Sequence, residues 1–98
     1  LIGLTRSLAL EVAKQGITVN AICPAWMRTD MTAKTIRQRA ALAGLSDDAM
    51  VAEMERRIPR GTSPDVTEMV PFVVFLASEE ASWITGEAMN ISGGQVMH

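Results

Sequence analysis

The stretch GITVNAICPAWMRTDM, residues 16–31, decides the fold of this 98-residue chain. Its first half is short, nearly all apolar and β-branched at residues 17–19, which is typical of a strand buried on both faces of a parallel sheet. Pro24 has no backbone N–H to give to a central ladder, so we expect it to end the strand. Varied side chains follow at once, which raises the question of what they do there.

Two residues inside the predicted strand differ from their apolar neighbours. Asn20 is polar in a buried setting and needs hydrogen-bond partners, so we expect its side chain to bridge backbone groups. Cys23 is interpreted as a small buried hydrophobe rather than a nucleophile. It has no His nearby in the sequence, and its first cationic neighbour along the strand and loop is Arg28.

The residues before the strand predict an amphipathic helix over 1–15. Its apolar stripe is formed by Leu1, Leu4, Leu8 and Val12. Gly16 is well placed to end it in the left-handed conformation. No capping residue precedes the stripe, so we expect the chain to begin inside a helix.

Two helices of different strength are predicted after the strand. Residues 29–45 have a weaker helical tendency that Gly44 breaks. Ser46 is a suitable cap for a second short helix, with two Asp residues in its first turn and Pro59 as its stop.

A further helix is expected over residues 66–78. Ser63 is the best candidate for its cap, and Pro64 suits the first helical position. The helix body is apolar nearly all round, so it should be well buried. Pro71 lies inside it and should bend it there.

A second short strand, EAMNIS at residues 87–92, completes the pattern. A strand, a long crossover and a strand form a parallel βαβ unit. The order helix, strand, one or two helices, helix, strand predicts the end of a doubly wound α/β sheet. Ligands bind beyond the carboxyl ends of such strands, where residues 24–31 and 92–95 lie.

Composition narrows the possible functions. Hydrophobic residues make up 48% and charged residues 20%, as in one small globular domain, and the net charge of −2 gives no indication of a nucleic-acid surface. No apolar run reaches the roughly 18 residues of a membrane span. A single Cys favours a reducing compartment, and we expect a cytoplasmic protein. With His98 as the lone histidine, no metal site is expected.

The ordered motifs carry a resemblance to a known family. Residues 16–31 resemble the VN-x-I-x-PG-x-x-x-T-x-M segment of the short-chain dehydrogenase/reductases. Residues 57–94 resemble that family's closing pattern, R-x-G-x-P-E-E…FLAS-x-x-A-x-x-I-T-G-x-x-x-x-V-D-GG, in a form like that of 3-oxoacyl-acyl-carrier-protein reductases. The match covers nearly the whole chain in order.

The resemblance implies a Rossmann-like, NAD(P)-binding fold in which residues 1–98 are the C-terminal part of one domain. It also implies hydride transfer between NAD or NADP and a secondary alcohol or ketone, in a homodimer or homotetramer. The family's catalytic Ser, Tyr and Lys and its Gly-rich phosphate loop lie before the matched segment, and this chain contains no Tyr. We therefore assign no catalytic residue here and expect the chain to be inactive alone.

By the same resemblance, Pro24 and Ala25 lie against the nicotinamide ring. Met27 offers backbone groups to its carboxamide, and the Thr29 hydroxyl hydrogen-bonds that carboxamide. Thr29 can also cap the following helix, and both roles can hold at once, although Asp30 competes for the cap. Ala25 stands where the family usually has Gly, which leaves less room for close backbone approach.

The remaining candidates belong to the substrate side. The resemblance makes residues 30–58 a substrate lid, and Trp26 and Met31 are substrate candidates, although packing explains either of them as well. Ser92 stands where the family commonly has Asp, so it keeps a small polar group without the charge.

A second hypothesis is a non-catalytic truncated product that acts as an interaction or oligomerisation segment. Two strands without the rest of a sheet leave a strand edge unpaired and apolar surface uncovered, which favours association.

Overall fold

The structure, a computed structural model, describes residues 1–97, so His98 lies outside the described part. The described residues form four α-helices, three 3-10 turns and one pair of strands. The elements in chain order are α1 (Ile2–Val12), the 3-10 turn η1 (Ala13–Gln15), β1 (Ala21–Pro24), α2 (Asp30–Ala43), α3 (Asp47–Glu55), η2 (Val66–Met69), α4 (Val70–Leu76), η3 (Glu79–Ala81) and β2 (Ala88–Ile91).

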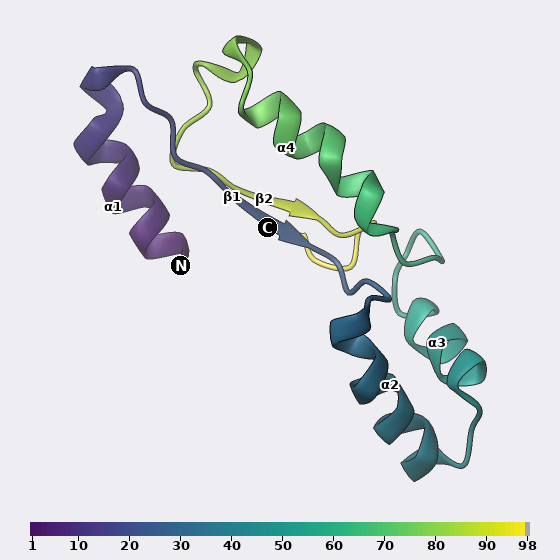
Figure 1. Ribbon diagram of the computed structural model, residues 1–98. Coiled ribbons are helices and arrows are strands. Elements are labelled where there is room, and N and C mark those ends of the chain that lie inside the picture. The colour runs from purple at the N-terminus through teal and green to yellow at the C-terminus, as the bar shows by residue number, and fades with distance from the viewer. Residues whose placement is uncertain (98) are drawn as a thin grey trace.

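The two strands pair in parallel, as the crossover pattern predicted. Their register runs from Ala21 opposite Ala88 to Pro24 opposite Ile91. Pro24 is the last residue of β1, and the Ala25 N–H extends the ladder by one bond of 2.9 Å to the Ile91 carbonyl. In Figure 1, α1 and α4 flank the strand pair, whereas α2 and α3 continue beyond its carboxyl end. The described chain is elongated, with extents of 55 × 24 × 23 Å.

Strand β1 begins at Ala21, later than the predicted start at residue 17. Before Ala21, hydrogen bonds with side chains take the place of backbone ladder bonds. The Asn20 amide nitrogen donates to the Ile84 carbonyl at 2.9 Å, and its oxygen accepts from the Glu87 N–H at 3.1 Å. The Val19 N–H donates to the Thr85 hydroxyl at 3.1 Å. The predicted bridging role of Asn20 is confirmed.

The first helix follows its prediction with one change at its end. Helix α1 stops at Val12, and η1 supplies the last turn before Gly16, which takes the left-handed conformation with φ 73°. Only part of its apolar stripe is covered: Ala9 is buried, whereas Leu4 and Leu8 are exposed.

Helices α2 and α3 form a hairpin that corresponds to most of the predicted lid. Gly44 ends α2 with φ 69°, and Ser46 caps α3 by accepting from the Ala49 N–H at 3.1 Å, both as predicted. Helix α3 ends at Glu55, before Pro59. Buried apolar residues anchor the hairpin, namely Ile36, Ala40 and Val51.

The predicted cap of the next helix is wrong. Asp65, not Ser63, caps η2 by accepting from the N–H and the hydroxyl of Thr67 at 2.9 and 3.0 Å. These two bonds lower the pKa of the Asp65 carboxyl below its ordinary value. Ser63 instead donates its hydroxyl to Glu55 Oε1 at 2.6 Å, which fastens this loop to the end of α3. Pro64 therefore lies outside the helix.

Instead of a bend at Pro71, the structure has a change of helix type just before it. The 3-10 turn η2 passes into α4 at Val70, so Pro71 lies in the first turn of α4. Its missing N–H costs no intrahelical bond at that position. The predicted single helix over 66–78 is thus a shorter α-helix with a 3-10 entry.

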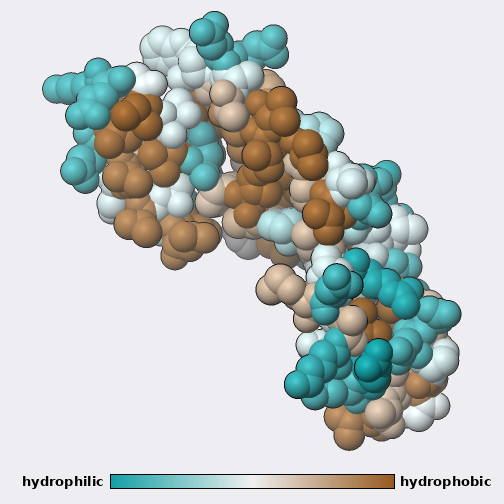
Figure 2. Space-filling model, viewed as in Figure 1, coloured by the Kyte–Doolittle hydropathy of each residue, from teal (hydrophilic) through white to brown (hydrophobic). Residues whose placement is uncertain are grey.

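The expected burial of this helix is also wrong for this chain. Phe72 and Phe75 are 44% and 42% exposed, and the valines of α4 are more exposed still. Figure 2 shows the resulting hydrophobic surface over α4. Residues 1–97 supply no element that covers this face. None of the helices they form has the length and hydrophobicity needed to cross a membrane.

Candidate functional site

The candidate site is the edge of the sheet at which both parallel strands end. Residues 25–29 follow β1 there, and Ser92, Gly93 and Gly94 follow β2. The loop that leaves α3 returns to the same edge, since the Arg60 N–H donates to the Gly93 carbonyl at 3.0 Å. Parallel strands bring three separate segments to one ligand-binding edge in this way.

The start of the segment after β1 is rigidly held. Ala25 is buried, and its N–H is used by the strand ladder. No non-glycine residue among the described ones has a positive φ, so Ala25 takes ordinary backbone geometry. The Ala in place of Gly thus introduces no left-handed strain. Pro24 precedes it with an exposed ring.

Thr29 is the N-cap of α2, and Asp30 is the first residue of the helix. Thr29 and Thr32 form a capping box, in which the Thr32 hydroxyl accepts from the Thr29 N–H at 2.8 Å. The two hydroxyl oxygens lie 3.4 Å apart. The capping interpretation of Thr29 is confirmed, and its contact with a carboxamide stays a prediction.

The backbone of Met27 is held by the same capping residue. The Met27 carbonyl lies 2.9 Å from the Thr32 hydroxyl, which can donate to it. The Met27 N–H takes no part in that contact. Sequence reasoning missed Thr32, although the T-x-x-T spacing resembles a capping box and could have indicated it.

The two substrate candidates are not brought together. Trp26 lines a cavity of about 150 Å³ between the hairpin and the C-terminal segment, with Arg39 and Arg57 among its other lining residues. Met31 is 92% exposed and lies outside this lining. The arrangement supports Trp26 as a wall residue of a cavity with cationic neighbours.

The glycine pair after β2 allows close approach of the segment that leaves α3. A Cβ on Gly93 would lie 3.0 Å from Ile58 Cγ2 and 3.1 Å from Arg60 Cβ. A Cβ on Gly94 would lie 3.2 Å from the Pro59 ring. The pair therefore anchors the end of the hairpin, which sequence reasoning did not predict.

The neutral side chain of Ser92 holds the turn that follows β2. It is buried, and its hydroxyl both accepts from the Val96 N–H and donates to the Val96 carbonyl, each at 3.1 Å. A Ser in place of the common Asp thus satisfies a buried position without charge.

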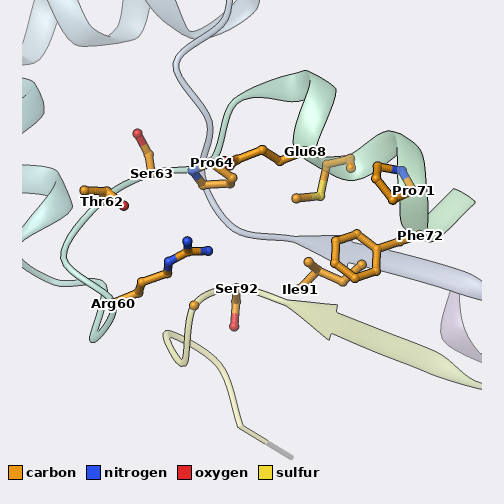
Figure 3. A pocket seen from close by; sticks show the side chains of 11 residues that line it. Arg60, Thr62, Ser63, Pro64, Glu68, Pro71, Phe72, Ile91 and Ser92 are labelled. Carbon is orange, nitrogen blue, oxygen red and sulfur yellow. The ribbon is translucent and has the colours of Figure 1, made fainter.

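A second and larger cavity, of about 340 Å³, lies between this edge and the start of α4 (Figure 3). Figure 3 shows Arg60 reaching toward it from the loop, while Phe72 and Ile91 lie on its apolar side. The Glu68 carboxylate at its rim accepts from the Asp65 N–H at 3.1 Å. Within residues 1–97, no three metal-ligating side chains gather at a common point.

A parallel strand pair joined by a helical crossover, with three segments meeting at its carboxyl edge, is typical of the α/β class of proteins with an open parallel sheet. The family model described as "Enoyl-(Acyl carrier protein) reductase" matches residues 1–96. The chain belongs to the short-chain dehydrogenase/reductase family.

Individual relatives agree with this assignment. The chain is 42% identical to "3-oxoacyl-[acyl-carrier-protein] reductase FabG" of Rickettsia bellii and of Escherichia coli, with 99% of this chain covered in each case. It covers 36% and 35% of those two proteins, so it spans about a third of the length of the curated relatives it matches.

Solved structures confirm the fold. A short chain dehydrogenase family protein from Francisella tularensis matches with a TM-score of 0.92 at 33% identity, over 96% of this chain and 39% of that one. The F189W actinorhodin polyketide ketoreductase with NADPH matches with a TM-score of 0.87 at 33% identity, over 96% and 36% of the two chains. The Rossmann-like interpretation of the sequence is therefore confirmed.

Proposed function

We propose that residues 1–98 form the C-terminal part of an NAD(P)-dependent oxidoreductase and supply the nicotinamide-side wall and the substrate lid. The observation that carries the proposal is the fixed segment from Ala25 to Thr29 at the carboxyl end of β1. Parallel α/β sheets bind their ligands at such a position. The family membership of the chain supports the same assignment.

The wall suits the amide of a nicotinamide ring. A carboxamide offers one acceptor oxygen and one donor NH₂, and a Thr hydroxyl can serve either. We assign that contact to Thr29, and the backbone contact to the Met27 N–H, since the Thr32 hydroxyl can donate to the Met27 carbonyl. Pro24 and Ala25 would form the apolar surface against the ring.

The cofactor would be NAD or NADP: its reduced form would give a hydride to a ketone, and its oxidised form would accept one from a secondary alcohol. Relatives named as 3-oxoacyl-[acyl-carrier-protein] reductases and a ketoreductase with NADPH support this reaction class. Residues 30–58 would be the lid, with Trp26 and Met31 on the substrate side. We place the whole protein in the cytoplasm as a homodimer or homotetramer.

One observation favours the second candidate, an interaction or oligomerisation segment. Most of the apolar residues of α4 are exposed in this chain, as are Leu4 and Leu8 of α1. Contiguous exposed apolar surface favours association. In the proposed enzyme the same surface would be covered by the rest of the domain or by another subunit.

Activity measurements test the proposal directly. The complete protein, meaning the product of the reading frame that contains these residues, should oxidise NADH or NADPH in the presence of a 3-oxoacyl thioester or a simple ketone. The 98-residue chain should give no turnover, because it holds no Tyr for proton transfer. A complete protein without turnover on any carbonyl substrate, or an active 98-residue chain, would contradict the proposal.

A further inference from the structure

The hydroxyl of Thr32 meets the backbone of the wall at more than one point. Its oxygen accepts from the Thr29 N–H at 2.8 Å. It also lies 2.9 Å from the Met27 carbonyl and 3.0 Å from the Thr29 carbonyl, either of which its single hydrogen can serve. One side chain thus fixes a three-residue segment.

These contacts exceed what capping requires. Of the N3 side chain, a capping box requires only the bond to the N-cap N–H. The bond to Met27 reaches five residues back, beyond the helix and into the segment that follows β1. Thr32 is half-buried, so water competes less with these bonds than at a fully exposed helix start.

We infer that Thr32 is a positioning residue for the nicotinamide end of the cofactor. Its hydroxyl holds residues 27–29 in the geometry that presents the Met27 N–H and the Thr29 hydroxyl together. It touches neither cofactor nor substrate itself. The inference rests on the proposed function, because it assumes that this segment contacts the carboxamide.

The arrangement also ties the wall to the lid. Thr32 belongs to the first turn of α2, whereas Met27 belongs to the segment after β1. Movement of α2 away from the sheet edge would break the bond to the Met27 carbonyl. The wall therefore keeps its geometry only while the first turn of α2 stays in place.

The test compares ligands with and without nicotinamide. Thr32→Val keeps the side-chain shape and removes the hydroxyl, whereas Thr32→Ser keeps the hydroxyl. In the complete protein, Thr32→Val should bind NADH or NADPH about fivefold to tenfold more weakly, as expected for one or two lost hydrogen bonds. Thr32→Ser should stay within about twofold of the original affinity.

ADP-ribose and its 2′-phosphate are the matched ligands, since they lack the nicotinamide. Their affinity, measured by calorimetry, should be unchanged in Thr32→Val. Thr35→Val is the matched control variant, because Thr35 is exposed on the same helix. Melting temperatures show whether each variant is folded. If Thr32→Val does not fold, Thr32→Ala is used in its place.

Four outcomes would overturn the inference. Unchanged NAD(P)H affinity in Thr32→Val would show that the hydroxyl does not position the wall. Equal weakening of NAD(P)H and of the ADP-ribose ligands would show a merely structural role. If the unmutated protein binds NAD(P)H no more tightly than the ADP-ribose ligands, the proposed contact with the carboxamide contributes no affinity. An original protein that binds none of these ligands would refute the proposed function, and this inference with it.

Discussion

Gly93→Ala should lower the free energy of unfolding of the complete protein by about 2–4 kcal/mol, the sum of a left-handed backbone penalty and overpacking. The new Cβ would lie 3.0 Å from Ile58 Cγ2 and 3.1 Å from Arg60 Cβ. Ile58 is only 2% exposed, and the Arg60 Cβ is fixed by its own backbone, so neither can swing aside. Urea titration measures the change.

Gly44→Ala is the matched control for this prediction. Gly44 has φ 69°, near the 59° of Gly93, but a Cβ there would meet no atom within 4 Å. It should cost only the backbone penalty, about 1 kcal/mol. If the two variants lose equal stability, close approach at Gly93 is not what requires the glycine.

Asn20→Ala should lower the free energy of unfolding by about 1–2 kcal/mol, because two hydrogen bonds are lost and one of them is part-buried. The side chain bridges the Ile84 carbonyl and the Glu87 N–H, at 2.9 and 3.1 Å, just before the strands pair. Its loss would also free the strands to separate at that end. Chemical denaturation of the complete protein measures the effect.

The control for Asn20 is Thr85→Val. It removes a single hydrogen bond between the same two segments, the 3.1 Å contact from the Val19 N–H, in an exposed position where water can replace it. We expect a loss below about 1 kcal/mol. A loss as large as that of Asn20→Ala would mean that any contact at this end suffices and that the double bridge of Asn20 has no special role.

Periodicity and strand chemistry predicted the architecture well. The parallel pair, the glycines that end η1 and α2, and the Ser46 cap all follow from local rules that the sequence displays directly. Asn20 was predictable too, because a polar amide in a buried strand must find partners.

What could not be predicted depends on contacts between distant segments. Gly93 is required by Ile58 and Arg60, which precede it by more than thirty residues, and no local pattern announces that approach. Ser63 has the chemistry of a cap, but the Glu55 carboxylate captures it and leaves the cap to Asp65. The apolar composition of α4 indicated burial, but a composition does not say which element covers a face.

The candidate site divides in the same way. The position after β1 was predictable from topology, since ligands bind where parallel strands end. The T-x-x-T spacing could have indicated the capping role of Thr32, but not its bond to the Met27 carbonyl, which arises only when the helix start folds back on the preceding segment.

The most direct test of the central claim is a crystal structure of the complete protein with NADH or NADPH bound. We expect the nicotinamide ring against Pro24 and Ala25, and its carboxamide within hydrogen-bond distance of the Met27 N–H and the Thr29 hydroxyl. A nicotinamide bound elsewhere, with residues 24–29 free of contact, would contradict the assignment of this segment as the cofactor wall.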